Sequence, residues 1–256
     1  MALLAGKTIL VTGVTMQTSI AYQVARIAQD EGATVIVSNF GRALSLTRRA
    51  VTRLVPVPEV IELDVTDADH LARLPDLVSE RADGLDGLVH SVAYANPNTA
   101  LGGRFLETSW EDVSTALHVS AYSMAELVRV VRPLLHPGAS VVGLTFDASV
   151  SWPAYDWMGV AKAALESTSR YLARYLGEFS IRSNIVSAGP LDTLAKKAIP
   201  GVENLDAIWD DRAPLGWDPT DSAPAAQAVV ALLSDWFPKT TGEIIHVDGG
   251  VHSTGA

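Results

Sequence analysis

A phenol and an ammonium stand seven positions apart in the stretch WPAYDWMGVAK, which runs from Trp152 to Lys162. Two turns of α-helix return positions i and i+7 to one face, about 10 Å apart along the axis. If a helix begins here, Tyr155 and Lys162 point into the same cleft, with the phenol as hydrogen-bond donor and the ammonium beside it. A half-buried anchor next to a solvated charge would show the same spacing. The pair therefore needs support from the rest of the chain.

Alternating strands and helices are predicted around this pair. Short apolar, β-branched runs closed by turn residues predict buried strands over residues 7–12, 34–38, 60–63, 87–91, 139–145, 182–186 and 243–247. Helical periodicity predicts helices over residues 19–31, 42–54, 67–82, 110–132, 155–179 and 222–233, and Pro75 favours a break in the third. This order indicates an α/β fold: a single Rossmann-like, doubly wound parallel sheet with helices on both faces, formed by residues 1–256 as one domain.

Ligands of an open parallel sheet collect at the carboxyl ends of its strands. After the first predicted strand, Gly13 permits a tight turn, and Ser19 stands where a helix N-terminus offers free N–H groups to a phosphate. The dinucleotide fingerprint G-x-G-x-x-G keeps a single glycine here, so an ordinary N-cap is the alternative for Ser19. After the second strand, Phe40 is suited to stacking on an adenine or to a place in the core.

The next two strand ends carry further candidates. Asp64, followed by Val65, can accept the amino group of an adenine or cap the following turn. The small residues at 91–93 (Ser-Val-Ala) allow a flat cofactor to approach the backbone. Each feature alone is more often structural, but their occurrence at successive strand ends indicates a dinucleotide.

Composition excludes several other classes of function. The chain has 48% hydrophobic residues, no cysteine and a formal net charge of -10. Disulfides and thiolate metal sites are therefore excluded, and the excess negative charge disfavours binding to nucleic acid or to an anionic membrane. The sequence shows no signal-peptide pattern and no apolar run of membrane-spanning length, which favours a cytoplasmic protein. Four histidines lack metal-ligand spacing, and no metal is expected: His90, His118, His246 and His252.

Five motifs resemble those of the short-chain dehydrogenase/reductase superfamily, and within it the enoyl-acyl-carrier-protein reductases of actinobacterial (mycobacterial) type. They are Gly13-x5-Ser19-x-Ala21, the stretch 90–94 (HSVAY), Phe146-Asp147, Pro153-Ala154-Tyr155-x6-Lys162 and the stretch 188–195 (AGPLDTLA). Most of the superfamily has Tyr-x3-Lys, which would require a tyrosine at 158, where this chain has methionine. The wider Tyr-x6-Lys spacing is typical of the enoyl reductase branch.

The resemblance implies roles for individual residues. It implies catalysis by Tyr155, Lys162 and Phe146. It implies that NADH is bound by Gly13, Ser19, Ile20, Phe40, Asp64, Val65, Ser91, Val92, Ala93, Lys162 and Thr193. It further implies reduction of the 2,3 double bond of trans-2-enoyl thioesters on acyl-carrier protein in type II fatty-acid synthesis, by a homotetramer.

Some features leave alternatives open. Asp192 stands where many relatives have arginine, and the segment that follows is shorter than in the mycobacterial long-chain enzymes. We expect residues 194–211 to form a substrate-binding lid whose Lys196 and Lys197 meet the acidic carrier protein, unless both are ordinary solvated charges. Another short-chain reductase, acting on enoyl-CoA or a 3-ketoacyl thioester, and a non-catalytic dinucleotide-binding regulator are the competing interpretations. Phe146 and the Tyr155 spacing argue against a ketoreductase.

Overall fold

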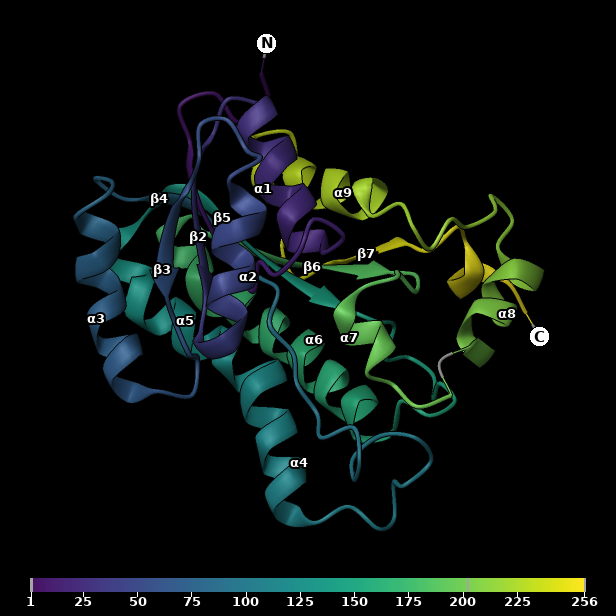
Figure 1. Ribbon diagram of the computed structural model, residues 1–256. Helices are drawn as coiled ribbons and strands as arrows, with labels where there is room; N and C mark the ends of the chain where they lie inside the picture. The colour runs from purple at the N-terminus through teal and green to yellow at the C-terminus, as the bar shows by residue number, and fades with distance from the viewer. Residues whose placement is uncertain (1, 202, 256) are drawn as a thin grey trace.

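The computed structural model describes residues 2–201 and 203–255, and a parallel sheet forms its centre (Figure 1). Within these residues, seven strands pair in the order β3-β2-β1-β4-β5-β6-β7. They are β1 (Thr8–Thr12), β2 (Thr34–Asn39), β3 (Glu59–Glu62), β4 (Leu85–His90), β5 (Leu135–Thr145), β6 (Arg182–Ala188) and β7 (Ile244–Val247). The order reverses between β1 and β4, and ligands of such sheets bind at this point. The predicted fold class is confirmed.

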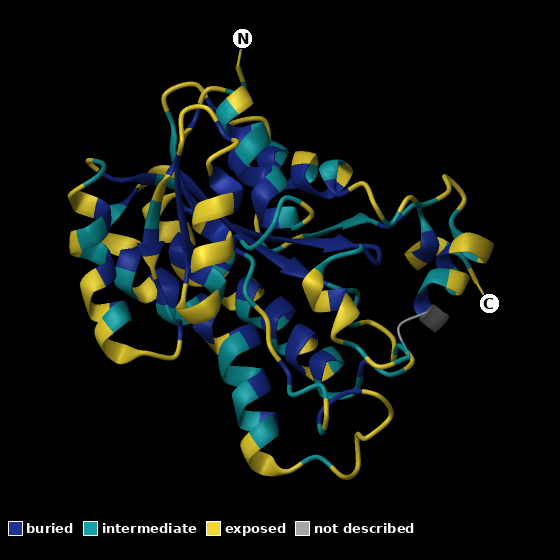
Figure 2. Ribbon diagram, viewed as in Figure 1, coloured by how far each residue is buried: buried dark blue, intermediate teal, exposed yellow. Residues whose placement is uncertain are grey.

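Helices cover both faces of the sheet, and the side chains of each strand alternate between them. One face packs against α1 (Ile20–Asp30), α2 (Gly41–Val51) and α9 (Ala223–Leu233). The other packs against α3 (Ala68–Ser79), α5 (Ser123–Val131) and α6 (Asp156–Leu176). On β1, Ile9 and Val11 face the first layer and Leu10 the second, as the two-residue period of a strand requires. Figure 2 shows the resulting buried layer along the strands.

The region predicted as one helix over residues 110–132 contains three segments. The α-helix α4 (Trp110–Leu117) passes into a π-helical turn at His118–Tyr122 before α5 begins. This wider turn brings Ser120 to the chain that follows β4, where its hydroxyl accepts from the Tyr94 N–H (2.9 Å) and donates to the Tyr94 carbonyl (3.0 Å). The π-helical turn therefore fastens the helix to the segment at the end of β4.

The predicted break at Pro75 is absent, and the expectation was wrong. Helix α3 continues through the proline from Ala68 to Ser79. Its buried residues Leu71, Leu74 and Val78 lie on both sides of Pro75 and pack into the second core layer. Burial of this apolar face outweighs the one backbone hydrogen bond that proline cannot make.

Two short helices, α7 (Leu194–Lys197) and α8 (Glu203–Arg212), follow β6 and lie beyond the sheet (Figure 1). None of the helices that the structure describes is both long enough and apolar enough to cross a membrane.

Candidate active site

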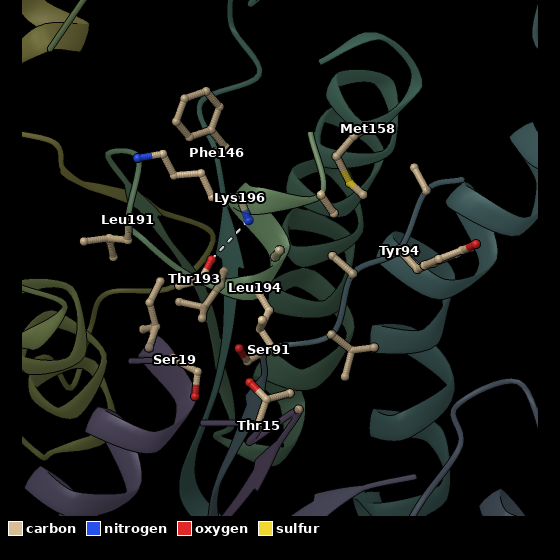
Figure 3. Close-up of a pocket in the computed structure, with 18 of the residues that line it drawn as sticks. Thr15, Ser19, Ser91, Tyr94, Phe146, Met158, Leu191, Thr193, Leu194 and Lys196 are labelled. Atoms are coloured by element: carbon tan, nitrogen blue, oxygen red, sulfur yellow. Dashed lines mark hydrogen bonds between the residues drawn. The ribbon is translucent and has the colours of Figure 1, made fainter. Parts of the chain in front are cut away.

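A cavity of about 470 Å³ opens at the carboxyl ends of the central strands, between the sheet and the α7–α8 segment (Figure 3). Twelve residues predicted from the sequence line it: Gly13, Ser19, Ile20, Phe40, Val65, Ser91, Val92, Ala93, Phe146, Tyr155, Lys162 and Thr193. Asp64 is absent from the cavity wall. Its carboxylate instead accepts from the backbone N–H (2.9 Å) and the hydroxyl (2.8 Å) of Thr66. The fold thus gathers residues that lie far apart in the sequence into one wall.

The turn after β1 is built on glycine for a steric reason. Gly13 has a φ of 75°, and a Cβ placed on it would lie 2.0 Å from the carbonyl oxygen of Ser91. Glycine is therefore required by the contact between the β1 and β4 ends as well as by the backbone conformation. Ser19 caps α1: its hydroxyl accepts from the Tyr22 N–H at 3.2 Å and donates to the Met16 carbonyl at 2.7 Å. Ser19 itself faces the cavity, at the positive end of α1.

Tyr155 lies immediately before α6, as its N-cap residue, instead of inside the helix. Its neighbours Ala154 and Asp156 both have positive φ, 61° and 40°. This backbone is disfavoured for residues other than glycine and must be held by its surroundings. The Asp156 carboxylate accepts from the N–H groups of Gly103 (2.7 Å) and Arg104 (2.9 Å), and these bonds hold the strained turn.

The Tyr155 side chain is only 7% exposed and packs edge-on against Phe146, with 5.2 Å between ring centroids. Burial, together with the negative charge of Glu166, raises the pKa of Tyr155 above its ordinary value. The phenol is therefore protonated at physiological pH. Tyr155 is held as a hydrogen-bond donor at the cavity wall.

Lys162 is buried two turns further along α6, and its ammonium donates to the carbonyl of Leu144 at 2.8 Å. Burial lowers the pKa of Lys162 to about 8, against an opposing effect of the Glu166 charge. The side chain is therefore cationic at neutral pH, though close to titration. Fixed to the end of β5, it supplies a positive charge inside the cavity.

Glu166, one turn after Lys162, is a site residue that we did not predict. Its carboxylate accepts from the Thr145 hydroxyl (3.0 Å) and from the Ala148 N–H (3.3 Å). Burial raises the pKa of Glu166, while these hydrogen bonds act in the opposite direction. The residue ties α6 to the loop after β5 that carries Phe146. The sequence feature that could have indicated Glu166 is its position four residues after Lys162, because residues at this spacing are neighbours on one face of a helix.

An aromatic cluster covers Phe146. Trp209 of α8 lies 5.5 Å from Phe146 and 5.0 Å from Trp152, measured between ring centroids. The indole of Trp209 also donates to the Asp248 carbonyl at 3.0 Å, which fixes α8 to the chain after β7. Trp209 is buried in this cluster beside Phe146, and no local sequence pattern indicates that position.

The histidines at 90, 118, 246 and 252 make contacts other than metal ligation. His90 is buried in the core, where its Nε2 pairs with the Ser123 hydroxyl at 2.8 Å. Burial, with the nearby charge of Lys162, lowers the pKa of His90 to about 3, so the ring is neutral. His246 and His252 stack at 3.9 Å, and His118 pairs with Glu126. In the described part of the chain, no group of acidic or histidine side chains is arranged to hold a metal ion.

The expectation that Lys196 meets a carrier protein at the surface was wrong. Its side chain is 8% exposed, because it turns inward from α7 toward the carboxylates of Asp192 (2.7 Å) and Asp206 (2.6 Å). Lys197, the next residue, is exposed. Thr193 caps α7 by accepting from the Lys196 N–H at 3.2 Å, the bond drawn in Figure 3.

A parallel sheet with its cavity at the switch point, a fixed tyrosine donor and a buried lysine define a Rossmann-like protein built for a dinucleotide. The family model described as Enoyl-(Acyl carrier protein) reductase matches residues 13–252. The chain belongs to this family.

Three curated relatives extend the comparison. The chain is 45% identical to Enoyl-[acyl-carrier-protein] reductase [NADH] of Mycolicibacterium smegmatis, with 97% of each chain covered. The relative of the same name in Mycobacterium avium is also 45% identical, again over 97% of each chain. Enoyl-[acyl-carrier-protein] reductase [NADH] FabI of Rickettsia typhi is 37% identical over 99% of this chain and 97% of its own.

Proposed function

We propose that this protein is an NADH-dependent enoyl-acyl-carrier-protein reductase, which reduces the 2,3 double bond of trans-2-enoyl thioesters in type II fatty-acid synthesis. Family membership supports the reaction, and the names of the relatives at 45% identity support NADH as cofactor. The observation that carries the proposal is the buried, protonated Tyr155 at the wall of the same cavity as the buried Lys162.

We propose that a dinucleotide occupies the cavity, and the residues that line it support this. Gly13, Ser19, Ile20 and Thr193 are proposed to surround the pyrophosphate, because the N-terminus of α1 and small or hydroxyl side chains meet there. Phe40 and Val65 are proposed to hold the adenine. Asp64 contributes to this subsite through the turn that it forms with Thr66. Ser91, Val92 and Ala93 leave room for the nicotinamide beside the end of β4.

Bound NADH supplies the hydride that reaches the β-carbon of the substrate. Negative charge then develops on the thioester carbonyl oxygen of an enolate, and the α-carbon of this enolate takes up a proton from solvent to complete the reduction. The phenol of Tyr155 donates a hydrogen bond to that oxygen, and it stabilises the charged species more than the neutral substrate. Phe146 holds the tyrosine ring by edge-on packing and excludes water from one side of it.

Lys162 acts on the cofactor in this proposal. Its ammonium is fixed by the Leu144 carbonyl, and its remaining N–H donors are available to the nicotinamide ribose. The same positive charge stabilises the developing negative charge nearby. Glu166 acts indirectly, as a positioning residue for the loop that carries Phe146.

The proposal extends to the physiological setting. We propose that acyl-carrier protein is the partner that delivers the enoyl group. We also propose that the protein assembles as a homotetramer in the cytoplasm. Within its single domain, we propose that residues 194–211 form the lid of the cavity. The names of the relatives support the carrier protein. The position of α7 and α8 beside the cavity supports the lid.

The deciding experiment follows NADH oxidation with a trans-2-enoyl thioester and a 3-ketoacyl thioester of equal length, side by side. We expect rapid oxidation with the enoyl substrate and little with the ketoacyl substrate. A preference for the ketoacyl thioester would replace the proposal with a ketoreductase. NADH binding without oxidation of either substrate would favour a non-catalytic regulator.

A further inference from the structure

Lys196 occupies an unusual place for a lysine. It lies on the four-residue helix α7, and it is among the residues that line the cavity. Its ammonium contacts one carboxylate before α7, that of Asp192, and one on α8, that of Asp206. The ion pairs therefore join two segments that are separated by the turn at Pro200 and Gly201.

The burial of this charge requires its partners. An ammonium taken out of water is destabilising unless opposite charges and hydrogen bonds replace the water. Burial alone lowers the pKa of Lys196, but hydrogen bonds and charge from Asp192 and Asp206 outweigh it and raise the pKa above the ordinary value. Lys196 is thus a cation at physiological pH and holds both carboxylates.

The segment has two arms, the first formed by α7 with the residues beside it and the second by α8. Apolar residues adjoin Lys196 on both arms. Ala198 and Ile199 follow it on the first arm, Leu205 precedes Asp206 on the second, and all three line the cavity. A cavity of about 470 Å³ is at the lower end of the range for ligand sites, and it must admit both a dinucleotide and an acyl group. An acyl group that enters this cavity therefore lies against the two arms that Lys196 joins.

We propose that Lys196 is a specificity-determining residue: its ion pairs with Asp192 and Asp206 hold the two arms together and limit the length of acyl chain that the cavity accepts. The inference rests on the proposed function for its substrate class. The closure itself is a property of the ion pairs of Lys196 with Asp192 and Asp206, and it can be measured without substrate.

Hydrogen–deuterium exchange tests the closure. Lys196→Met keeps a side chain of similar length without the charge, and Asp206→Asn keeps the shape of the partner while removing its charge. Both variants are expected to raise the rate of amide exchange in peptides covering 192–212, and Lys196→Met should raise it about tenfold. A tenfold change corresponds to a loss of stability between that for removing an exposed ion pair and that for breaking a fully buried one. Lys197→Met, which removes the exposed neighbouring charge, is the matched control and should leave exchange unchanged.

Steady-state kinetics test the specificity. With trans-2-enoyl-CoA thioesters, Lys196→Met should raise the ratio of kcat/KM for dodecenoyl over crotonyl substrate about five- to tenfold, while Lys197→Met leaves it unchanged. NADH affinity should stay at the wild-type value in the Lys197→Met control. Exchange that is unchanged in Lys196→Met, or raised equally in Lys197→Met, would overturn the closure. A looser segment with an unchanged ratio would overturn the role in specificity. If the wild-type protein reduces neither substrate, the proposed function fails while the exchange result still decides whether the arms are joined.

Discussion

Replacing Tyr155 by phenylalanine removes one oxygen atom and leaves the rest of the side chain in place. The ring is 7% exposed and packs on Phe146, a contact that phenylalanine keeps. This contact of the Tyr155 side chain is ring packing, which does not depend on the phenol oxygen. The folded protein should therefore be nearly as stable as wild type.

The cost should fall on the chemical step. Removing one donor to a developing oxyanion costs about 2.7–4 kcal/mol, or a factor of about 10²–10³ in kcat. Because burial raises the pKa of Tyr155, the wild-type donor is fully protonated through neutral pH, and the loss should be constant from about pH 6 to 8.

The assay follows NADH oxidation at saturating NADH with an enoyl thioester, together with NADH binding by fluorescence and thermal unfolding. Tyr94→Phe is the matched control, because Tyr94 also lines the cavity but is 47% exposed and points away from Phe146 (Figure 3). It should change kcat less than about threefold. A Tyr155→Phe enzyme with kcat within threefold of wild type would refute the assignment of Tyr155 as the donor.

Three further predictions concern the cofactor side of the cavity. Gly13→Ala should lower the free energy of unfolding by about 3 kcal/mol in urea denaturation, because the added Cβ would overlap the Ser91 carbonyl at a positive φ. Gly41 also has a positive φ but has open space around it, so Gly41→Ala should lower the free energy of unfolding less. An equal loss in the two variants would contradict the steric argument. The dissociation constant for NADH should rise as pH increases through about 8, because burial lowers the pKa of Lys162 to that value and the ammonium is lost above it. The Lys162→Met variant should bind NADH weakly, with a dissociation constant that does not change over this pH range. If the pH dependence persists in that variant, another group causes it. The ratio of kcat/KM should favour NADH over NADPH by at least about tenfold, because residues 38–41 offer no cation to a 2′-phosphate; a preference for NADPH would mean that Arg42 binds it.

The repeating elements were predictable because each rests on a local pattern. Strand β1 shows it: its apolar run ends at Gly13, and the alternation of Ile9, Leu10 and Val11 between two core layers follows from a strand covered on both sides. Since parallel strands share one carboxyl edge, the residues that follow each strand were predictable as neighbours. Lys162 and Ser19 meet the same cavity for this reason.

Features that depend on contacts between distant segments were not predictable. The π-helical turn at His118–Tyr122 is stabilised by the backbone of Tyr94, and nothing in the local helical pattern signals it. The inward turn of Lys196 depends on Asp206, ten residues away across a turn, whereas adjacent lysines in a polar stretch suggest exposure. The sequence allowed the Asp64 carboxylate either to bind an adenine or to cap the following turn. In the structure it caps the turn by accepting from Thr66.

The strained turn at Tyr155 places an unusual restriction on the exposed loop that precedes α4. Exposed loops ordinarily accept insertions and deletions, because their backbone serves no other element. Here the N–H groups of Gly103 and Arg104 hold the Asp156 carboxylate, and the Gly102 N–H bonds the Ala154 carbonyl at 2.9 Å. A change of length at residues 102–104 would therefore release the backbone on both sides of Tyr155. Library designs that diversify this enzyme by loop grafting should keep that tripeptide fixed and vary its neighbours.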